Sequence, residues 1–380
     1  MLIGLDTRNT GRGRGTGVAT YAATLKNACI ATGLQPMMLH DETATAHSAH
    51  SLASRIARAI RSTMPSRSLS LKQQGYTCTD LYRTAEVRDR LWESPTLVKS
   101  TQSPTIMHWT YPLPMNWPGI PNIVTIHDII PVLHPKLSGI SSNRIIRRLN
   151  DWINRADAIV TVSNSVKSDL INCFSVPESK IFMSSQPVSF SNSLLHEASQ
   201  TPAPCEPGGF IYFGTLESRK NIGRIIDAHS RSKTTRHLTL IGEKGHGSDN
   251  ELRALVSHRK PETVTIVPWC SLPSLIRAIS EARAVVFPSL AEGFGLPIIE
   301  AMALQTPVIT SRGHATEEIS GSAALLVNNT DTNELAYAFN LLDKDDALCM
   351  KLQEAGLNRA KDFSFTAYAQ RMSLFYRTFL

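Results

Sequence analysis

The sequence lacks the features that mark secreted, zinc-binding and membrane-spanning proteins. Its six cysteines are scattered and form no C-x-x-C pair, which argues against a disulfide framework or a zinc site. No run of about 18 apolar residues occurs, so we expect no spanning helix. An acidic residue, Asp6, comes before any apolar run develops, unlike in a secretory signal. These absences predict a cytoplasmic protein that uses no metal and no cofactor.

Acidic residues are scarce in the first half of the chain. Residues 1–190 contain 20 Lys and Arg against 12 Asp and Glu, a net charge of +8, whereas residues 191–380 contain 19 against 20, a net charge of −1. The overall 42% of hydrophobic and 19% of charged residues are those of a globular protein and exclude general disorder. We therefore expect the first half to contact any acidic partner.

Short apolar runs alternate with helical patterns in both halves. Runs of four to six residues of this kind are typical of parallel strands that are covered on both faces. The predicted strands are 2–6, 36–40, 105–108, 122–127 and 158–162, then 210–214, 238–242, 264–268, 284–288 and 307–310. Two such series predict two doubly wound α/β domains with ligands at the carboxyl ends of the strands, in a cleft between the domains. The Ser-, Pro- and Ala-rich segment 186–209 predicts the linker between them.

The most informative stretch is 287–311, which predicts a strand, a glycine-rich turn, a helix and another strand. Glu292 precedes the helix and Glu300 lies eight residues later, inside it. Gly293 and Gly295 let the backbone approach a ligand closely. Since a carboxylate accepts two hydroxyl hydrogen bonds at once, this arrangement suits the vicinal diols of sugars. For either glutamate alone, a helix cap or a solvated position is the alternative, but the whole stretch favours a sugar site.

The sequence E-G-F-G-L-P-x-x-E-A-M-A of residues 292–303 resembles the motif of the retaining glycosyltransferases of family 4, which have the GT-B fold. Residues 210–221, with G-T-L-E-S-R-K-N, are similar to the donor loop of that family, and residues 123–135 to its H-D-x-x-P-x-x-H-P segment. Residues 157–163 match the strand that follows, and 363–365 resemble the family's F-S-W, with Phe in place of Trp. The resemblance covers nearly the whole chain and implies two Rossmann-like domains that face each other across a cleft.

The resemblance also implies roles for individual residues. Glu300 would bind the ribose of a nucleotide-sugar donor, and Glu292 with the neighbouring amides would hold the transferred sugar. Lys220 would pair with the diphosphate, and His127 would lie at the reacting face of the sugar. The implied catalytic residues are His127, Glu292 and Lys220; the implied donor-binding residues are Gly15, Thr16, Gly17, Arg219, Lys220, Glu292, Gly293, Phe294, Gly295, Leu296 and Glu300.

Two of these assignments depart from well-defined motifs. Many relatives carry an arginine where this chain has Thr215, and Arg219 is our hypothesis for its substitute. The loop 11–18 is rich in glycine but matches neither a dinucleotide-binding fingerprint nor a P-loop. Its position in relatives makes Gly15, Thr16 and Gly17 candidate contacts, and an ordinary mobile turn is an equal alternative.

A basic amphipathic helix is predicted near residues 51–62. Arginines recur every three residues, and apolar side chains occupy the other face. The arginines are Arg55, Arg58 and Arg61, and the apolar residues are Leu52, Ile56, Ala59 and Ile60. This pattern is compatible with binding to an anionic membrane, and a simply solvated face is the alternative. No motif that reads DNA or RNA accompanies the charges, so we expect no nucleic acid partner.

Together, the residues and the resemblance predict an acceptor-binding domain at 1–190, a donor-binding domain at 191–360 and a final helix at 361–380 that crosses back to the first domain. The predicted activity is retaining transfer of a hexose, most simply mannose from GDP-mannose, to a glycan or lipid-diphosphate-linked acceptor in bacterial polysaccharide assembly. The expected location is the cytoplasm and the inner face of the plasma membrane. A nucleotide-sugar 2-epimerase of the same fold and a non-catalytic nucleotide-sugar-binding protein are the alternatives.

Overall fold

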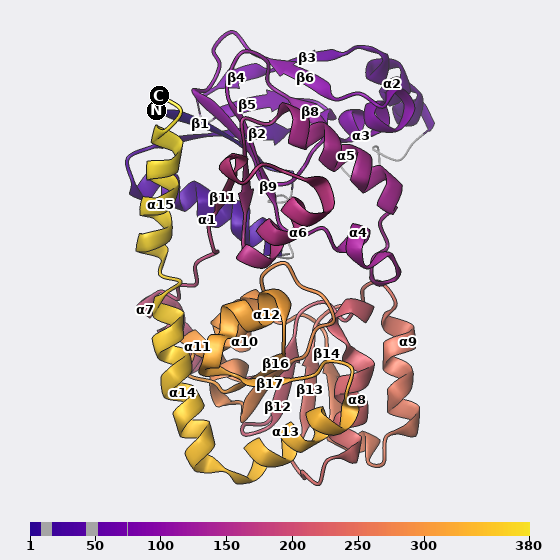
Figure 1. Ribbon diagram of the computed structural model, residues 1–380, viewed down its shortest axis with the longest axis vertical. Helices are drawn as coiled ribbons and strands as arrows, with labels where there is room; N and C mark the ends of the chain where they lie inside the picture. Colours follow the sequence, from indigo (N-terminus) through magenta and orange to yellow (C-terminus); the bar gives the residue numbers. More distant parts are fainter. Residues whose placement is uncertain (9–16, 43–51, 74) are drawn as a thin grey trace.

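The computed structural model describes residues 1–8, 17–42, 52–73 and 75–380, which form two α/β lobes stacked end to end (Figure 1). Each lobe contains a sheet of mainly parallel strands with helices packed around it. The central strands of both sheets are buried along their whole length, as the continuous apolar runs predicted. The prediction of two doubly wound α/β units is therefore confirmed.

The first lobe is built on an eight-stranded sheet of order β11-β10-β9-β7-β1-β2-β5-β4, in which only the β4–β5 pair is antiparallel. Its strands are β1 (Leu2–Asp6), β2 (Gln35–Asp41), β4 (Ser70–Lys72), β5 (Gly75–Cys78), β7 (Ile106–Trp109), β9 (Asn122–Ile126), β10 (Ala158–Thr161) and β11 (Ile181–Met183). A small parallel sheet contains β3 (Ser66–Ser68), β6 (Thr96–Lys99) and β8 (Met115–Asn116). The helices are α1 (Gly17–Ala31), α2 (Leu52–Thr63), α3 (Leu81–Trp92), α4 (Ile130–Leu133), α5 (Ser142–Arg155) and α6 (Asn164–Phe174).

The second lobe is built on a fully parallel six-stranded sheet of order β14-β13-β12-β15-β16-β17. Its strands are β12 (Phe210–Phe213), β13 (Leu238–Ile241), β14 (Val264–Val267), β15 (Ala284–Phe287), β16 (Val308–Ser311) and β17 (Leu325–Val327). The helices are α7 (Asn192–Gln200), α8 (Ile222–Arg231), α9 (Ser248–Leu252), α10 (Leu272–Glu281), α11 (Leu296–Ala303), α12 (His314–Ser320), α13 (Thr332–Lys344) and α14 (Asp346–Lys361).

One segment forms a helix within the predicted linker, and the final helix returns to the first lobe. The predicted linker is not extended throughout, because residues 192–200 form α7, which is capped by the Ser191 hydroxyl and packs against α10. At the other end of the chain, α15 (Phe365–Arg377) runs back and packs against α1 of the first lobe (Figure 1). The two chain ends consequently lie close together at the top of the first lobe.

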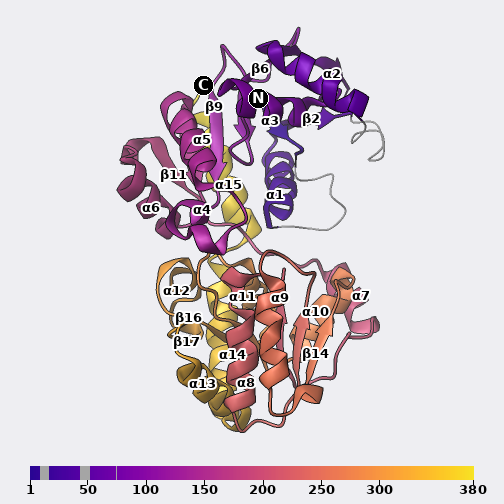
Figure 2. The ribbon, with the colours of Figure 1, turned by 90° about the vertical axis from the view of Figure 1, so that its right-hand side faces the viewer.

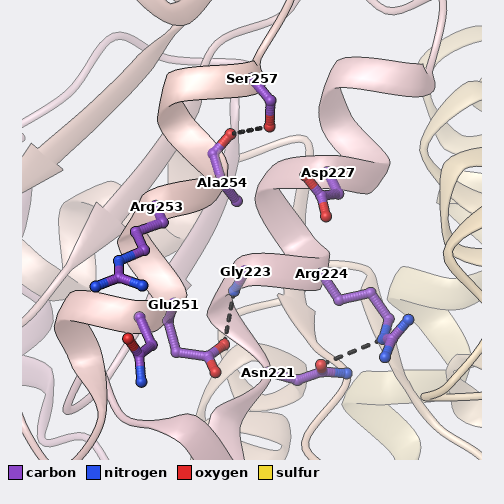
Figure 3. A pocket seen from close by; sticks show the side chains of 9 residues that line it. Asn221, Gly223, Arg224, Asp227, Glu251, Arg253, Ala254 and Ser257 are labelled. Carbon is purple, nitrogen blue, oxygen red and sulfur yellow. Dashed lines mark hydrogen bonds between the residues drawn. The ribbon is translucent and has the colours of Figure 1, made fainter.

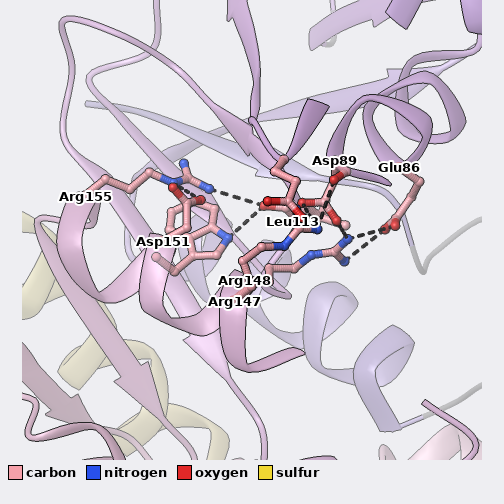
Figure 4. Close-up of polar contacts among 9 residues, drawn as sticks. Glu86, Asp89, Leu113, Arg147, Arg148, Asp151 and Arg155 are labelled. Carbon is pink, nitrogen blue, oxygen red and sulfur yellow. Dashed lines mark hydrogen bonds and ion pairs between the residues drawn. The ribbon is translucent and has the colours of Figure 1, made fainter. Parts of the chain in front are cut away.

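Two arginines of α5, Arg147 and Arg148, form ion pairs with carboxylates of α3 (Figure 4). Arg148 donates from Nη1 and Nη2 to the two carboxylate oxygens of Glu86 on α3, at 3.1 and 2.9 Å, and also pairs with Asp89. Arg147 reaches Asp89 at 3.2 Å. These ion pairs join α5 to α3, so some of the basic side chains of this lobe hold helices together.

The helix α2 has its faces reversed relative to our prediction of a membrane-facing row of arginines. Arg58 donates from Nε and Nη2 to Asp80, at 2.8 and 3.1 Å, and Arg61 reaches the same carboxylate at 2.9 Å. Arg58 is only 8% exposed, because Asp80 at the start of α3 draws it inward, whereas Arg55 is exposed. The side chains that face outward are Leu52, Ile56, Ile60 and Met64, which are 53–70% exposed.

No helix of the described ranges is long and apolar enough to cross a membrane. Likewise, no group of three or more His, Cys, Asp and Glu side chains in these ranges could hold a metal ion.

Candidate active site

The loops that follow β12 and β15 meet at the carboxyl ends of these neighbouring strands. Asn221, whose φ of 64° lies in the left-handed region that asparagine tolerates, ties the loops together. Its side-chain amide donates to the carbonyl of Pro288 at 3.0 Å, and Leu290 N–H donates to the carbonyl of Arg219 at 2.7 Å. The local fold thus brings the residues before α8 next to those before α11, as expected for a ligand site in a doubly wound sheet.

This junction places Arg219 and Lys220 directly on the carboxylate of Glu292. Arg219 Nη1 lies 2.9 Å from one oxygen of Glu292, and Lys220 Nζ pairs with the other. Arg219 also reaches Glu217 at 2.8 Å, and Lys220 Nζ lies 4.5 Å from the centre of the Phe287 ring. Two cations therefore converge on one buried carboxylate at the edge of the sheet.

Burial and pairing act in opposite directions on these charges. Although burial favours its neutral form, the pKa of Glu292 is lowered, because Arg219 and Lys220 stabilise the carboxylate. Burial lowers the pKa of Lys220, and the attraction of Glu292 offsets only part of this effect. An incoming anion that contacted Lys220 would supply the charge compensation that Glu292 provides here.

His127, which follows β9 of the first lobe, lies at the same junction, where its carbonyl oxygen closely approaches Gly293. Its Nε2 lies 2.9 Å from the carbonyl of Thr110, which can only accept, so Nε2 carries the proton. Burial lowers the pKa of His127 to about 4, and the ring is therefore neutral at pH 7. The edge-to-face contact with Tyr21, at 4.8 Å between ring centres, fixes its orientation. Nδ1 keeps a lone pair that can accept a hydrogen bond from a hydroxyl group.

Gly293 brings the two lobes into direct backbone contact. A Cβ atom at this position would lie 1.9 Å from the carbonyl oxygen of His127, so a side chain does not fit there. The Ser163 hydroxyl, at the start of α6, donates to the Gly293 carbonyl at 2.7 Å. Phe294 is buried and packs edge-to-face on Phe363, with ring centres 5.8 Å apart. The turn is thus held from both lobes.

The helix α11 begins immediately after this turn. Gly295 has a φ of 106°, which favours glycine, and Leu296 is the first helical residue. Pro297 has no N–H and Ile298 N–H donates to the carbonyl of Gly295 at 3.0 Å, so the N–H at this helix start that is suited to an oxygen-rich ligand is that of Leu296. Glu300 lies one turn further along, and burial raises the pKa of its carboxyl to about 7.

Asp128 belongs to the site but was absent from our predicted set. It follows His127 in the first lobe, and Arg219, Glu292 and Lys220 of the second lobe all contribute to its electrostatic environment. Burial raises its pKa, and its Oδ1 accepts from Ile130 N–H at 3.0 Å. The signal was the H-D-x-x-P segment itself, in which only the histidine was assigned a role.

The structure describes only some of the other residues that we predicted to contact the donor. Gly15 and Thr16 lie outside the described residues, and Gly17 is the first residue of α1. Thr215, where relatives carry an arginine, is exposed, whereas Arg219 reaches into the cluster. The hypothesis that Arg219 substitutes for the missing arginine stays a prediction with a suitable geometry.

A separate pocket of about 450 Å³ lies between α8 and the segment from α9 to Ser257 (Figure 3). Two of its charged side chains are engaged by the protein: Glu251 accepts from Gly223 N–H at 2.8 Å, and Arg224 donates to the carbonyl of Thr330 at 2.9 Å. Arg219, Lys220 and Glu292 do not line it. We therefore place the candidate active site at the junction of the lobes and not in this pocket.

Two α/β lobes whose sheets present loops to a shared junction define the GT-B fold, and solved structures of that shape agree. A sucrose-phosphate synthase from Thermosynechococcus elongatus aligns with a TM-score of 0.71 over 99% of this chain and 98% of that one, at 18% identity. The Anabaena protein HepE, in complex with UDP and glucose, aligns with a TM-score of 0.70 over the full length of both chains, at 14% identity. These likenesses show the fold.

Family comparison identifies both lobes. Residues 15–188 match the family described as Glycosyltransferase Family 4, and residues 207–345 match Glycosyl transferases group 1. The two matches together cover both lobes, and the chain belongs to the glycosyltransferases of family 4, as the E-G-F-G-L-P motif indicated.

Curated relatives include enzymes with different substrates. O-antigen chain mannosyltransferase B of Escherichia coli is 30% identical over 266 residues, covering 64% of this chain and 66% of that protein. O-antigen chain mannosyltransferase RfbU of Salmonella typhimurium is 29% identical over 62% of this chain and 64% of its own length. A D-inositol 3-phosphate glycosyltransferase of Pseudarthrobacter chlorophenolicus is 29% identical over 43% of this chain and 41% of that protein. The chain thus spans just under two thirds of the length of the two mannosyltransferases that it matches.

Proposed function

We propose that this protein transfers a hexose from a nucleotide diphosphate sugar to a saccharide acceptor, with retention of the α configuration. The observation that carries the proposal is the convergence of Arg219 and Lys220 on Glu292, opposite the neutral His127, at the junction of the lobes. Cations suit a diphosphate, and a carboxylate with a neutral imidazole suits sugar hydroxyls. The UDP and glucose bound to the structurally similar HepE support a donor of this class.

In the proposed reaction the negative charge develops on the leaving diphosphate. Lys220 and Arg219 exchange part of their contact with Glu292 for the phosphate oxygens and stabilise that charge, so the reaction requires no metal. Glu292, released from these ion pairs, accepts hydrogen bonds from the sugar, and His127 Nδ1 accepts one from an outer hydroxyl. The acceptor hydroxyl attacks the sugar from the face that the diphosphate leaves, and the diphosphate assists in removing the proton of this hydroxyl. Water is excluded as the lobes close on the substrates.

For the donor we propose GDP-mannose. Its support is the match to two O-antigen mannosyltransferases over both lobes, and the same match supports a place in bacterial polysaccharide assembly. The test is the release of nucleoside diphosphate from a panel of labelled nucleotide sugars, with and without saccharide acceptors. Acceptor-dependent release from GDP-mannose supports the proposal, and preference for another donor corrects the sugar. Isomerisation of the donor would identify a 2-epimerase, and binding without turnover a non-catalytic protein.

For the acceptor we propose a lipid-diphosphate-linked saccharide at the cytoplasmic face of an anionic membrane. The support is the outward apolar face of α2, formed by Leu52, Ile56, Ile60 and Met64, together with the exposed Arg55. Since Arg58 and Arg61 are held by Asp80, insertion of apolar side chains supplies most of the proposed binding, and charge supplies less.

Co-sedimentation with phosphatidylglycerol-containing liposomes tests this membrane contact. We expect Ile56→Asp/Ile60→Asp to abolish binding and Arg55→Gln to weaken it. Ile30→Asp, which changes an isoleucine of α1 that is 56% exposed, is the matched control and should bind normally. Liposome binding that survives the double substitution would refute the contribution of α2.

A further inference from the structure

A carboxylate of the second lobe caps a helix of the first. Glu318 of α12 accepts three hydrogen bonds at the start of α6: Oε1 from Asn164 N–H at 2.8 Å and from the Asn164 side-chain amide at 3.1 Å, and Oε2 from Ser165 N–H at 2.8 Å. Figure 2 shows α6 at the lower edge of the first lobe and α12 at the upper edge of the second. The contact therefore crosses the junction between the lobes.

The physical character of this contact is favourable. The first N–H groups of a helix lack helical acceptors, and the positive end of the helix dipole attracts a carboxylate. Ser163, just before α6, accepts from Val166 N–H at 3.2 Å and thereby satisfies a third donor. The same Ser163 hydroxyl donates to Gly293, so four hydrogen bonds between the lobes originate within three residues of the first lobe.

Glu318 is also fixed within its own lobe. Arg359 of α14 donates to the carbonyl of Glu318 at 2.8 Å and to that of Ile319 at 2.9 Å. The guanidinium of Arg359 lies 5.0 Å from the ring centre of Phe363, which packs on Phe294 of the E-G-F-G turn. Contacts through Glu318, Arg359 and Phe363 thus connect α6 to the turn that carries Glu292.

We propose that Glu318 is a positioning residue for the transfer reaction, because it holds α6 on the second lobe and so sets the distance between His127 and the Glu292–Gly293 turn. His127 and Glu292 belong to different lobes, and Gly293 already touches the His127 carbonyl. A small rotation of the lobes would separate the two side chains that contact the sugar. The proposal rests on the proposed glycosyl transfer, whichever hexose is transferred.

The location of the contact separates this role from a purely structural one. Asn164 and Glu318 lie at the solvent-exposed margin of the junction, where a hydrogen bond contributes little to the stability of either lobe. Donor-binding groups such as Lys220 and Glu300 lie entirely in the second lobe. Loss of the contact should therefore lower kcat and leave the KM for the donor nearly unchanged.

The chain offers a variant that removes the partner without disturbing the helix. Asn164 is the first residue of α6, where proline is tolerated, and the preceding Ser163 has φ −152° and ψ 162°, which a following proline permits. Asn164→Pro removes two of the three donors to Glu318. Glu318→Ala removes the acceptor, and Glu318→Gln keeps an acceptor without the charge. Glu334→Ala, whose carboxylate bonds only within the second lobe, to Arg312 and Asn328, is the control.

With the full-length protein, its donor and acceptor, we expect Glu318→Ala to lower kcat about tenfold, with the donor KM within twofold of wild type. Glu318→Gln should lose about threefold, and Asn164→Pro should resemble Glu318→Ala. The double variant should be no worse than either single one, because both remove the same contact. Small-angle X-ray scattering should show a larger radius of gyration for Glu318→Ala, and Glu334→Ala should match wild type in both measurements.

A folded Glu318→Ala protein with wild-type kcat overturns the inference, as does a double variant whose losses multiply. A wild-type protein that turns over no donor counts against the proposed function instead. In that case the scattering profiles decide about Glu318: an expanded Glu318→Ala protein supports its role in holding the lobes, and identical profiles refute it.

Discussion

Both lobes contain buried ion pairs of arginine with carboxylates, and they use them differently. In the first lobe Arg148 of α5 pairs with Glu86 and Asp89 of α3. In the second lobe Arg219 and Lys220 pair with Glu292 where β12 and β15 end. The first arrangement holds helices together, whereas the second sits where a doubly wound sheet binds ligands. The place of an ion pair in the fold, and not its chemistry, indicates its use.

The same comparison shows why the net charge of a segment is a poor guide to its surface. The first 190 residues have a net charge of +8, but individual cations of this half are directed inward: Arg58 to Asp80, just before α3, and Arg148 to Glu86 of α3. The second half is nearly neutral, yet it contains the cluster of two adjacent cations at the candidate active site. Ion pairing leaves the net charge of each half unchanged, and the structure decides where the individual charges lie.

The largest effect on activity should follow from a substitution in the second lobe. Lys220→Ala should lower kcat by about 100-fold to 1000-fold, because it removes a cation that stabilises the leaving diphosphate. The measurement is steady-state release of nucleoside diphosphate by the folded variant. Lys361→Ala, which changes an exposed lysine of α14, should keep normal turnover. Near-normal turnover in Lys220→Ala would show that the ion pairs of this lobe are structural too.

A substitution in the first lobe should lower the stability of the protein and leave its activity nearly unchanged. Arg148→Met leaves Glu86 and Asp89 without their buried partner and should destabilise the protein by about 3 kcal/mol. Chemical denaturation followed by circular dichroism measures this loss, and kcat of the folded fraction should stay within twofold of wild type. Arg90→Met, an exposed change on α3, the helix that carries Glu86 and Asp89, is the control. If Arg148→Met removes activity from a folded protein, the contrast between the lobes fails.

The smallest effect concerns protonation within the second lobe. Burial raises the pKa of Glu300 to about 7, so the free protein gains a proton there as the pH falls from 8 to 6. A neutral carboxyl accepts fewer hydroxyl hydrogen bonds, and nucleoside diphosphate affinity should fall with pH, by at most about tenfold per unit. Calorimetric titration at several pH values measures the slope, which Glu300→Gln should flatten. A slope that persists in this variant would belong to the phosphate groups or to another residue.

Much of the fold was predictable because buried parallel strands consist of continuous runs of apolar residues. All ten predicted strands are present, with ends shifted by at most one residue. The strands that were missed are short or polar, such as β4, whose three residues are all exposed. The helix α7 was missed because its Ser-rich sequence resembles a linker, although Ser191 caps it. The site was half predictable: Glu292 and Lys220 lie in recognisable motifs, as does Asp128 in H-D-x-x-P, but Ser163 and Glu318 carry no local signal of their contacts.

The sequence by itself determined the class of fold, the family and the residues of the donor motifs, because these depend on local periodicity and on short segments whose order is fixed along the chain. Only the tertiary structure decided which charges meet. Lys220 and Glu292 are 72 residues apart, and Asn164 and Glu318 are 154 apart. It also decided which face of α2 is outward, since Asp80, on another helix, draws the arginines in. Long-range pairing depends on how the lobes pack, and no local pattern encodes it.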